Sequence, residues 1–498
     1  MVALEIPNQV VFGMPKDMLT FTKVAQDYPT KRPAEERDDD FLEISRPFIV
    51  DKAEEQASRC SQCGVPFCQV HCPLHNHIPD WLMLTAEDRL QEAYEMAAST
   101  STMPEICGRI CPQDRLCEGN CVIEQSGHGA VTIGSVEKFI TDKAWDEGWV
   151  KPIRPVRDRS HRSVGIIGAG PAGLTAAELL RNKGYSVTVY DRYDRGGGLL
   201  TYGIPGFKLE KYVVGRRLKR LEEGGIEFRY NFDVGTDATM DELRETHDAI
   251  LVATGVYKAR ELQAPGVGTG GIVPALTYLI ASNRKGFGDE VPAFDSGKLD
   301  ADGKRVVVIG GGDTAMDCVR TAVRQGATSV KCLYRRDREN MPGSAREVQN
   351  AEEEGVEFVW LSAPTAFEDK EGEDGQKIVS AVRGTKMKLG PPGPDGRRQP
   401  EPGGEEFRED ADIVVMALGF SPEDLPTMFG VPDLGITRWG TLRTDHKTLM
   451  TSLDGVFAAG DIVRGASLVV WAVRDGRDVA ASMHAYLQAK DAEEKVAA

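Results

Sequence analysis

A buried strand, a glycine-rich turn and an apolar helix follow one another twice along this chain, and this repeat constrains the fold most. Apolar strands are expected at residues 164–167 and 306–309, and each leads directly into a glycine fingerprint. The fingerprint residues are Gly168, Gly170 and Gly173 in the first copy and Gly310, Gly312 and Ala315 in the second. Such glycines allow a tight turn, a close approach of the backbone to a pyrophosphate, and close packing of helix on strand. We therefore expect two parallel-sheet dinucleotide-binding domains.

The residue at the end of the second strand of each copy indicates which nucleotide binds. In the first copy this residue is Asp191, whose carboxylate can accept hydrogen bonds from the hydroxyls of an unphosphorylated ribose. In the second copy Arg335 and Arg336 hold the equivalent place, where guanidinium groups suit a 2′-phosphate. We predict FAD at the first site and NADPH at the second. The alternatives are a surface aspartate and a solvated basic pair.

Several residues outside the fingerprints are candidates for contact with the flavin. The glycine run that ends in Gly198 and Leu199 supplies flexible backbone that can lie against the isoalloxazine ring. Asp461, which follows Gly460, is a candidate for the ribityl or pyrophosphate region. A helix expected to begin near Ser467 would point its N-terminal dipole at the ring. No side chain is given a catalytic role, because nicotinamide and flavin carry the hydride chemistry themselves.

Eight of the ten cysteines lie in two groups within the first quarter of the chain. The groups read Cys60-x2-Cys63-x4-Cys68-x3-Cys72-Pro73 and Cys107-x3-Cys111-Pro112-x4-Cys117-x3-Cys121. The first group resembles the bacterial iron–sulfur run C-x2-C-x2-C-x3-C-P with one loop widened. In two-cluster ferredoxins the cysteine before proline serves the other cluster. The spacing therefore predicts two clusters that exchange ligands between the groups.

By this logic, Cys72 leaves the first group and Cys121 completes it. The first cluster is predicted to bind Cys60, Cys63, Cys68 and Cys121, and the second Cys72, Cys111 and Cys117. The fourth ligand of the second cluster is open between Cys107 and Glu137. Two tetrahedral zinc sites are the alternative, and disulfides are not expected in a reducing compartment.

Length and charge narrow the class of protein. A chain of 498 residues is expected to form about three domains. Its net charge of −17 makes nucleic acids and anionic membranes poor partners, because an acidic surface repels phosphate groups. Neither a secretory signal nor a membrane-spanning apolar run is visible, so a cytoplasmic location with reduced thiols is expected.

These patterns together predict an α/β protein with three domains. A helical iron–sulfur domain is expected at residues 1–150, followed by two interleaved Rossmann-like domains of the disulfide-reductase type. The FAD domain is predicted to be discontinuous, at residues 160–290 and 440–490, because the last segment has strand and helix signals but no fingerprint. The NADPH domain is predicted at residues 291–439. Its Gly/Pro-rich stretch within residues 369–410 is typical of exposed hairpins or loops.

Longer motifs resemble a known family over nearly the whole chain. The matching stretches are residues 72–81, 105–112, 191–195, 199–208, 310–317 and 459–467. They resemble the small (beta) subunits of NADPH-dependent glutamate synthase, within a wider family that includes the N-terminal module of dihydropyrimidine dehydrogenase. The resemblance implies FAD at the first fingerprint, NADPH at the second, and two 4Fe–4S clusters. It adds Asp313 and Thr314 to the NADPH site, and it favours Glu137 slightly as a cluster ligand from the stretch at residues 133–137.

The resemblance also implies a function and a partner. It implies an electron-input subunit that serves a large (alpha) subunit containing FMN and an iron–sulfur cluster. That subunit would make L-glutamate from L-glutamine and 2-oxoglutarate. A free-standing NADPH:ferredoxin-type oxidoreductase, or an electron module of another enzyme, is the first alternative. A zinc-stabilised scaffold without catalytic activity is the second.

Overall fold

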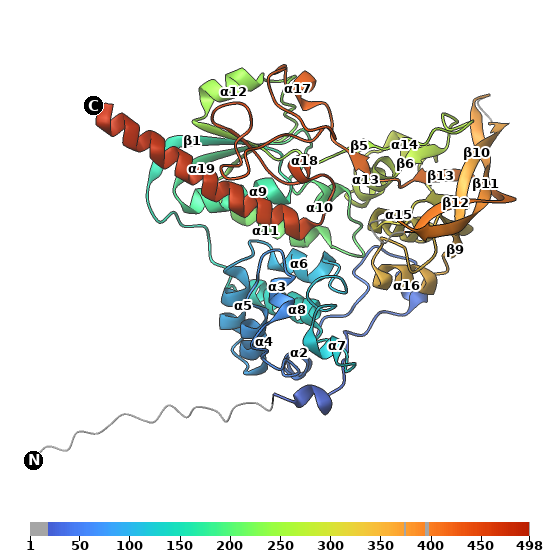
Figure 1. Ribbon diagram of the computed structural model, residues 1–498, viewed down its shortest axis with the longest axis horizontal. Helices are drawn as coiled ribbons and strands as arrows, with labels where there is room; N and C mark the ends of the chain where they lie inside the picture. The colour runs from blue at the N-terminus through green and yellow to red at the C-terminus, as the bar shows by residue number, and fades with distance from the viewer. Residues whose placement is uncertain (1–17, 373–374, 394–397, 498) are drawn as a thin grey trace, which may run out of the picture.

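The computed structural model describes residues 18–372, 375–393 and 398–497, and it divides into three parts. Figure 1 shows a helical domain below, one parallel sheet at the upper left, and a second sheet with a long antiparallel hairpin at the right. The predicted α/β class, with a helical N-terminal domain and two Rossmann-like domains, is confirmed. Residues 1–17 of the predicted first domain lie outside the described residues. No helix among the described residues is long and apolar enough to cross a membrane.

The helical domain is built around Trp81, which is fully buried and donates a hydrogen bond from Nε1 to Asn76 Oδ1 (3.0 Å). The helices pack around one apolar core that also contains Cys68 and Cys121. The helices are α2 (Val50–Ala57), α3 (Phe67–Val70), α4 (Ile78–Ala86), α5 (Leu90–Ala98), α6 (Pro104–Ile110), α7 (Val122–Gln125) and α8 (Ile133–Asp146).

The first parallel sheet carries the first fingerprint and has the strand order β15-β4-β1-β2-β3. Its strands are β1 (Arg159–Ile167), β2 (Tyr185–Tyr190), β3 (Glu227–Arg229), β4 (Ala249–Val252) and β15 (Val456–Ala458). The β15 strand pairs with β4 after an excursion of about 200 residues, so the two nucleotide domains are interleaved as predicted. The helices of this part are α9 (Pro171–Asn182), α10 (Leu199–Tyr202), α11 (Lys211–Glu223), α12 (Met240–Thr246), α17 (Leu425–Met428), α18 (Asp461–Arg464) and α19 (Val469–Ala497).

The second parallel sheet carries the second fingerprint and has the strand order β6-β13-β7-β8-β9. Its strands are β6 (Ile272–Pro274), β7 (Arg305–Ile309), β8 (Ser329–Tyr334), β9 (Glu357–Trp360) and β13 (Ile413–Met416). Helices α13 (Ala275–Gly286), α14 (Pro292–Asp295), α15 (Asp313–Arg324) and α16 (Ala345–Glu353) belong to the same part.

The border between the nucleotide domains differs from the predicted positions 290 and 440. Strand β6 pairs with β13, and α13 packs into the core of the second sheet. The chain crosses between the domains at a short antiparallel pair, β5 (Lys258–Ala259) with β14 (Phe420–Ser421). The sequence around β6 has no fingerprint of its own, so only its pairing assigns it to the second sheet. We therefore propose borders near the β5–β14 pair.

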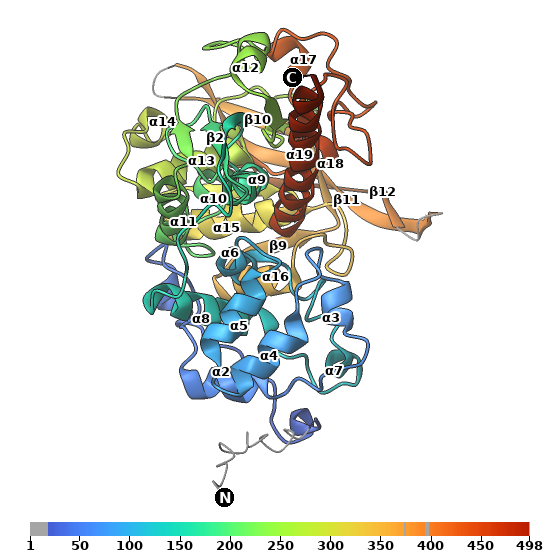
Figure 2. The same ribbon diagram turned by 90° about the vertical axis from the view of Figure 1, so that its left-hand side faces the viewer.

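The Gly/Pro-rich stretch is part of a three-stranded antiparallel sheet that extends from the second nucleotide domain. Its strands are β10 (Ser362–Glu371), β11 (Lys377–Pro392) and β12 (Arg398–Asp410), in the order β10-β11-β12. Figure 2 shows that the β11–β12 hairpin projects from the body of the molecule. Residues 394–397 of the predicted exposed segment lie outside the described residues.

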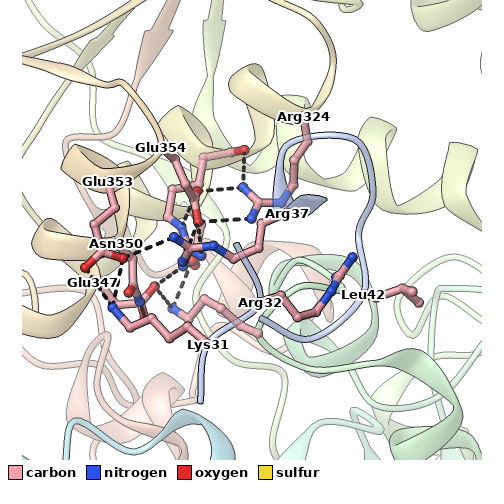
Figure 3. A network of polar contacts seen from close by, with 12 residues as sticks. Lys31, Arg32, Arg37, Leu42, Arg324, Glu347, Asn350, Glu353 and Glu354 are labelled. Atoms are coloured by element: carbon pink, nitrogen blue, oxygen red, sulfur yellow. Dashed lines mark hydrogen bonds and ion pairs between the residues drawn. The ribbon is translucent and has the colours of Figure 1, made fainter. Parts of the chain in front are cut away.

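Residues 18–49, here called the N-terminal arm, run from the helical domain to the second nucleotide domain. The arm contains the short helices η1 (Thr20–Thr22) and α1 (Ala34–Arg37) and is otherwise extended. Figure 3 shows side chains of the arm in contact with α15 and with the end of α16. Lys31 and Arg37 form ion pairs with Glu353 at 2.9 and 3.1 Å. The arm therefore joins the first and third parts of the fold.

Candidate functional site

The first fingerprint forms a tight strand-to-helix turn between β1 and α9. Gly168 has φ +109°, and a Cβ there would lie 2.4 Å from the carbonyl oxygen of Ala253. A Cβ on Gly173 would lie 2.0 Å from the carbonyl oxygen of Gly168. Gly170, at the N-cap of α9, has no atom within 4 Å of an added Cβ, so its face is open. The free N–H groups of the helix N-terminus face this open side, which suits a phosphate.

Asp191 follows β2 and is almost completely buried beside this turn. Its two carboxylate oxygens accept hydrogen bonds from the backbone N–H groups of Ala169 (2.7 Å) and Tyr193 (2.9 Å). Burial raises the pKa of Asp191, and these two N–H groups offset part of that rise. The fixed carboxylate retains further lone pairs for ribose hydroxyls.

Two adjoining cavities meet at Gly168 and Asp191. One cavity is lined by Arg192, Tyr257 and Glu423, which the sequence analysis did not identify. Arg192 forms an ion pair with Glu423 (3.0 Å), and its guanidinium lies 4.9 Å from the centre of the Tyr257 ring. An aromatic ring backed by a guanidinium suits a stacked purine. A sequence signal was available only for Tyr257, which follows the end of β4 closely. The other cavity is lined by predicted residues, namely Gly168, Gly170, Asp191, Leu199, Gly460, Asp461 and Ser467.

The end of this second cavity is formed by two helix starts. Gly460 has φ +78° and caps α18, so that Asp461 begins the helix. The Ser467 hydroxyl donates a hydrogen bond to Asp461 Oδ1 (2.7 Å). Burial raises the pKa of Asp461, which this hydrogen bond partly offsets. Helix α19 begins just after Ser467, and Leu468 and Val469 line the cavity. Gly198 lies at the N-cap of α10, next to Gly170, outside the lining of this cavity.

The second fingerprint repeats the geometry of the first between β7 and α15. Gly310 has φ +149°, and a Cβ there would lie 2.2 Å from the carbonyl oxygen of Ala417. Gly312 is open, with no atom within 4 Å of an added Cβ. Asp313 begins α15, and its carboxylate accepts a hydrogen bond from the N–H of Ser344 (2.9 Å). Thr314 is half-buried on the same turn and Ala315 is buried in the core, as a close helix–strand contact requires.

Arg335 and Arg336 follow β8 at the edge of this site. Arg335 is exposed, whereas Arg336 is half-buried. The Nε of Arg336 is buried without a hydrogen-bond partner among the described residues. A buried guanidinium N–H without a partner is costly, so it fits an anionic ligand that completes its hydrogen bonds. These residues therefore suit a phosphate on the ribose of a nucleotide.

The eight clustered cysteines gather at two places in the helical domain. Cys60 lies close enough to Cys63 and Cys121 for their charges to interact, and Cys68 interacts with Cys60 and Cys121. This is the set predicted for the first cluster. A separate cavity is lined by Cys72, Cys107, Cys111, Cys117 and Glu137, which includes both candidates for the fourth ligand of the second.

Burial and neighbouring groups raise the pKa of five of these thiols, which favours their protonated form. Burial raises the pKa of Cys60 and of Cys68 to about 12, and that of Cys72 to about 11. The pKa values of Cys111 and Cys117 are also raised, the first mainly by a hydrogen bond with Cys107 and the second by burial. Several thiolates cannot share such sites without positive charge, and iron would supply that charge, because metal binding requires and stabilises the thiolate. The donor set therefore fits iron–sulfur clusters.

Glu137 differs from Cys107 in its surroundings. The Cys107 thiol contacts Cys111 and the hydroxyl of Ser101 (3.9 Å). The Glu137 carboxylate forms no hydrogen bond or ion pair with another described residue, although only 9% of Glu137 is exposed. Burial is the main cause of its raised pKa. A buried carboxyl group without a partner is costly, which favours a ligand role for Glu137.

No group of three or more His, Cys, Asp or Glu side chains in the described part of the chain is arranged to hold a metal ion as it stands. The two other cysteines, Cys318 and Cys332, are buried in the second nucleotide domain and pack in its core.

One helix lines two of these sites, a feature that the sequence did not reveal. Val469 lines the cavity at the first fingerprint, and the adjacent Val470 lines the thiol cavity that contains Cys72. Further along the same helix, Arg477 donates hydrogen bonds from Nη1 to the carbonyl oxygens of Leu74 (3.1 Å) and Thr100 (3.3 Å). The start of α19 is therefore fixed between the two cavities.

Comparison with known families agrees with this division of the chain. A family model described as dihydropyrimidine dehydrogenase domain II, 4Fe-4S cluster, matches residues 37–149. A model described as pyridine nucleotide-disulphide oxidoreductase matches residues 162–476. The first match favours iron–sulfur clusters over the zinc alternative.

Individual relatives are similar over almost the whole chain. The chain is 65% identical over 474 residues to the glutamate synthase (NADPH) small chain of Azospirillum brasilense, covering 95% of this chain and 97% of the relative. It is 44% identical over 474 residues to the putative oxidoreductase AegA of Escherichia coli, covering 94% and 70%. The structure of FprA from Mycobacterium tuberculosis in complex with NADPH has a TM-score of 0.55 at 20% identity, covering 69% of this chain and 86% of FprA. That last likeness shows the fold alone.

Proposed function

The chain belongs to the family of glutamate synthase (NADPH) small chains, and on that premise we propose that it is an electron-input subunit that oxidises NADPH. When bound, FAD would take a hydride from NADPH, and two 4Fe–4S clusters would carry the electrons singly. The observation that carries the proposal is the adjacency of the flavin cavity and the thiol cavity along one helix. Val469 lines one and Val470 the other.

The residues of the first fingerprint are proposed to hold FAD. The open face at Gly170 and the N-terminus of α9 would bind the pyrophosphate, and Asp191 would bind the adenosine ribose. Asp461 and the start of α19 would orient the other end of the cofactor. Gly198, Leu199, Gly460 and Ser467 remain in the proposed set, because each lies in or beside this cavity.

The second fingerprint is proposed to hold NADPH. Gly310, Gly312, Asp313, Thr314 and Ala315 form the turn that would face the pyrophosphate. Arg335 and Arg336 are proposed to bind the 2′-phosphate, which only NADPH carries. The unpartnered Nε of Arg336 supports this assignment.

The cysteines are proposed to divide as the sequence predicts, with Glu137 as the fourth ligand of the second cluster. The proposed partner is a large glutamate synthase chain with FMN and an iron–sulfur cluster, which would make L-glutamate from L-glutamine and 2-oxoglutarate. A reducing, cytoplasmic setting suits these thiols. The likeness to AegA favours one alternative, an electron module that serves another oxidoreductase.

A double variant, Arg335→Ala with Arg336→Ala, tests the nucleotide assignment. Hydrogen bonds to a charged group contribute about 1.5–3 kcal/mol each, so we expect NADPH to bind at least ~30-fold more weakly. NADH binding should change less than ~3-fold, because NADH has no 2′-phosphate. Arg338→Ala is the matched control, because Arg338 forms an exposed ion pair with Glu352 (2.6 Å). Equal losses for both nucleotides would contradict the assignment.

The electron-input role and the partner are tested on the anaerobically purified chain. We expect flavin absorbance, about eight iron atoms per chain, and co-purification with a large FMN-containing chain. If the chain instead co-purifies with a different oxidoreductase, the glutamate synthase role is wrong although the NADPH chemistry stands.

A further inference from the structure

The short helix α10 forms part of the wall of the cavity that is proposed to hold FAD, here called the flavin cavity. Its first two residues, Leu199 and Leu200, line that cavity. Just before the helix, the N–H of Gly197 donates a hydrogen bond to the carbonyl oxygen of Ala169 in the fingerprint turn (2.8 Å). A single turn of helix is not stable on its own, so contacts at its other end decide where it lies.

One of these contacts is made by Lys211, the first residue of α11. Its Nζ donates hydrogen bonds to the carbonyl oxygens of Leu200 (3.1 Å) and Ile204, which lie within and just after α10. Carbonyl groups at the end of a helix lack partners within the helix, so the amino group supplies what they need. Burial lowers the pKa of Lys211 to about 7, and the charge of Asp317 offsets part of this effect. A lysine is costly in such a place, which indicates that its contacts are needed.

A second contact comes from the other nucleotide domain. Asn283 on α13 is buried, and its Nδ2 donates a hydrogen bond to the carbonyl oxygen of Tyr202 at the end of α10 (2.9 Å). The next residue, Arg284, forms an ion pair with Asp194 (2.8 Å), which also accepts a hydrogen bond from the Tyr202 hydroxyl. Figure 1 shows α10 on the side of the first nucleotide domain that faces α13. The second nucleotide domain is therefore bound directly to a helix of the flavin cavity.

These contacts place α10 between the two nucleotide sites. Its start is fixed to the first fingerprint and its end to α11 and to α13, so a change in the angle between the domains would also move a wall of the flavin cavity. In the proposed step NADPH loses a hydride to FAD, which leaves NADP⁺ and reduced flavin. Such a transfer requires close contact, and a displacement of about 1 Å can cost about 100-fold in rate.

We propose that Lys211 and Asn283 are positioning residues for hydride transfer, because through α10 they fix a wall of the flavin cavity relative to the second nucleotide domain. This inference rests on the proposed function. Neither residue lines the flavin cavity or belongs to the second fingerprint. Their loss should therefore leave the binding of both nucleotides intact and change the placement of one nucleotide relative to the other.

The test uses Lys211→Met and Asn283→Leu, two apolar replacements of similar size, each in the full chain with its cofactors. Stopped-flow absorbance at saturating NADPH should show flavin reduction about 10-fold slower in each variant. The Kd for NADPH, taken from the concentration dependence of the rate, should change by less than ~2-fold, because the second fingerprint is untouched. Reduction by dithionite needs no placement of nicotinamide, so its rate should stay within ~2-fold of the wild type.

Hydrogen exchange gives a readout that does not depend on turnover. In the oxidised chain with its cofactors, amide exchange of residues 199–204 followed by mass spectrometry should be ~3- to 10-fold faster in both variants, because each loses a hydrogen bond that holds α10. The matched control is Lys219→Met on the same helix as Lys211. The Lys219 side chain is 74% exposed and lies 3.7 Å from Glu223. The control should behave like the wild type in every assay.

Three results would overturn the inference and leave the proposed function intact. These are flavin reduction by NADPH at the wild-type rate in both variants, equal slowing with NADPH and dithionite, and unchanged exchange of residues 199–204. If one variant does not bind FAD, the other decides, because it acts on the same helix from the opposite domain. If NADPH does not reduce the flavin of the wild type, the proposed function is wrong and this inference is wrong with it.

Discussion

Replacing Glu354 with glutamine is expected to destabilise the second nucleotide domain and to release the N-terminal arm. Glu354 follows α16 and accepts hydrogen bonds from Arg320 (2.9 and 2.8 Å) and Arg324 (2.7 and 3.1 Å). Arg37 of the arm reaches the same carboxylate at 3.4 Å, as Figure 3 shows. The side chains of Glu354, Arg320 and Arg324 are 0% exposed. Three buried guanidinium groups therefore share the Glu354 carboxylate.

The size of the effect follows from this burial. Removing one partner of a buried ion pair costs about 3–5 kcal/mol, because the remaining charge stays buried without compensation. Because glutamine has nearly the same shape as glutamate, the substitution removes the negative charge and leaves the packing almost unchanged. For a domain of this size each kcal/mol lowers the Tm by about 2–4 °C, which gives a decrease of roughly 6–20 °C. Glu347, which also pairs with Arg320 (2.7 Å), remains in place.

The matched control is Glu352→Gln, two residues earlier. Glu352 pairs with Arg338 at 2.6 Å, but both side chains are at least one-third exposed. Exposed pairs contribute at most about 1 kcal/mol, so its Tm should fall by less than about 4 °C. Differential scanning calorimetry on both holo variants gives the comparison. A loss of equal size in the two variants would refute the reasoning from burial.

Limited trypsin digestion measures the second consequence. In the wild type Arg37 is almost fully buried, and Lys31 is held by Glu353. Without Glu354, Arg37 of the arm loses one of its two carboxylate partners, so cleavage after these residues should become faster at temperatures below unfolding. Unchanged cleavage would mean that the arm is held by other contacts.

The same network has a defined pH dependence. Burial acts to raise the pKa of Glu354, but hydrogen bonds from Arg320 and Arg324 outweigh it and lower the pKa from 4.5 to about 2. A carboxyl group whose pKa is lower in the folded state stabilises the fold above pH 4.5, and this contribution is lost as the pH falls towards 2. The difference in stability between the wild type and Glu354→Gln should therefore shrink between these two pH values.

Two further predictions concern the clusters. Because Glu137 is the proposed ligand, the Glu137→Gln variant is expected to lose about half of the bound iron and sulfide, whereas Cys107→Ser should keep both. Iron and sulfide assays measure this difference. The reverse result would identify Cys107 as the fourth ligand of the second cluster. Arg477→Met removes the hydrogen bonds to Leu74 and Thr100. In stopped-flow absorbance we expect NADPH to reduce the flavin at the wild-type rate, but the clusters to be reduced at least ~3-fold more slowly. The Arg477→Lys variant should restore part of the rate of cluster reduction. Equal slowing of both steps would mean that the substitution only loosens the packing of the protein.

The parts of this protein that depend on local geometry were predictable from sequence. Gly168 and Gly310 are required at their positions because a side chain would meet the carbonyl oxygens of Ala253 and Ala417. The proposal for the two nucleotides rests on the residue types at the ends of β2 and β8, which the sequence shows directly. Cysteine spacing also carries its own signal, because cluster ligands must return to one point within a few turns of helix. Such features can be predicted because they require particular residue types at a regular spacing, which a single sequence shows.

Contacts between segments that are distant in the sequence produce no such pattern of spacing. Arg477 and Leu74 are 403 residues apart, and Arg37 and Glu353 are 316 apart. A lone arginine in a polar stretch is ordinarily a solvated residue, so nothing in the sequence marks Arg37 as buried. The place of β6 was missed for a related reason. Its three residues belong to the second sheet only because they pair with β13, which follows about 140 positions later.

These long-range contacts hold the second nucleotide domain from two sides. From the first nucleotide domain, Lys208 forms an ion pair with Asp317 on α15 (2.9 Å), and from the helical domain the arm brings Arg37 to the end of α16. Both contacts act on the helix pair behind the second fingerprint, whereas α19 lines both the cavity at the first fingerprint and the thiol cavity. A transfer of hydride needs the two nucleotide sites at a fixed separation, since small errors in position are costly in rate. Well-packed apolar residues can stabilise a fold as well as a buried ion pair does, so we infer that these buried charges are retained because they fix the orientation of α15.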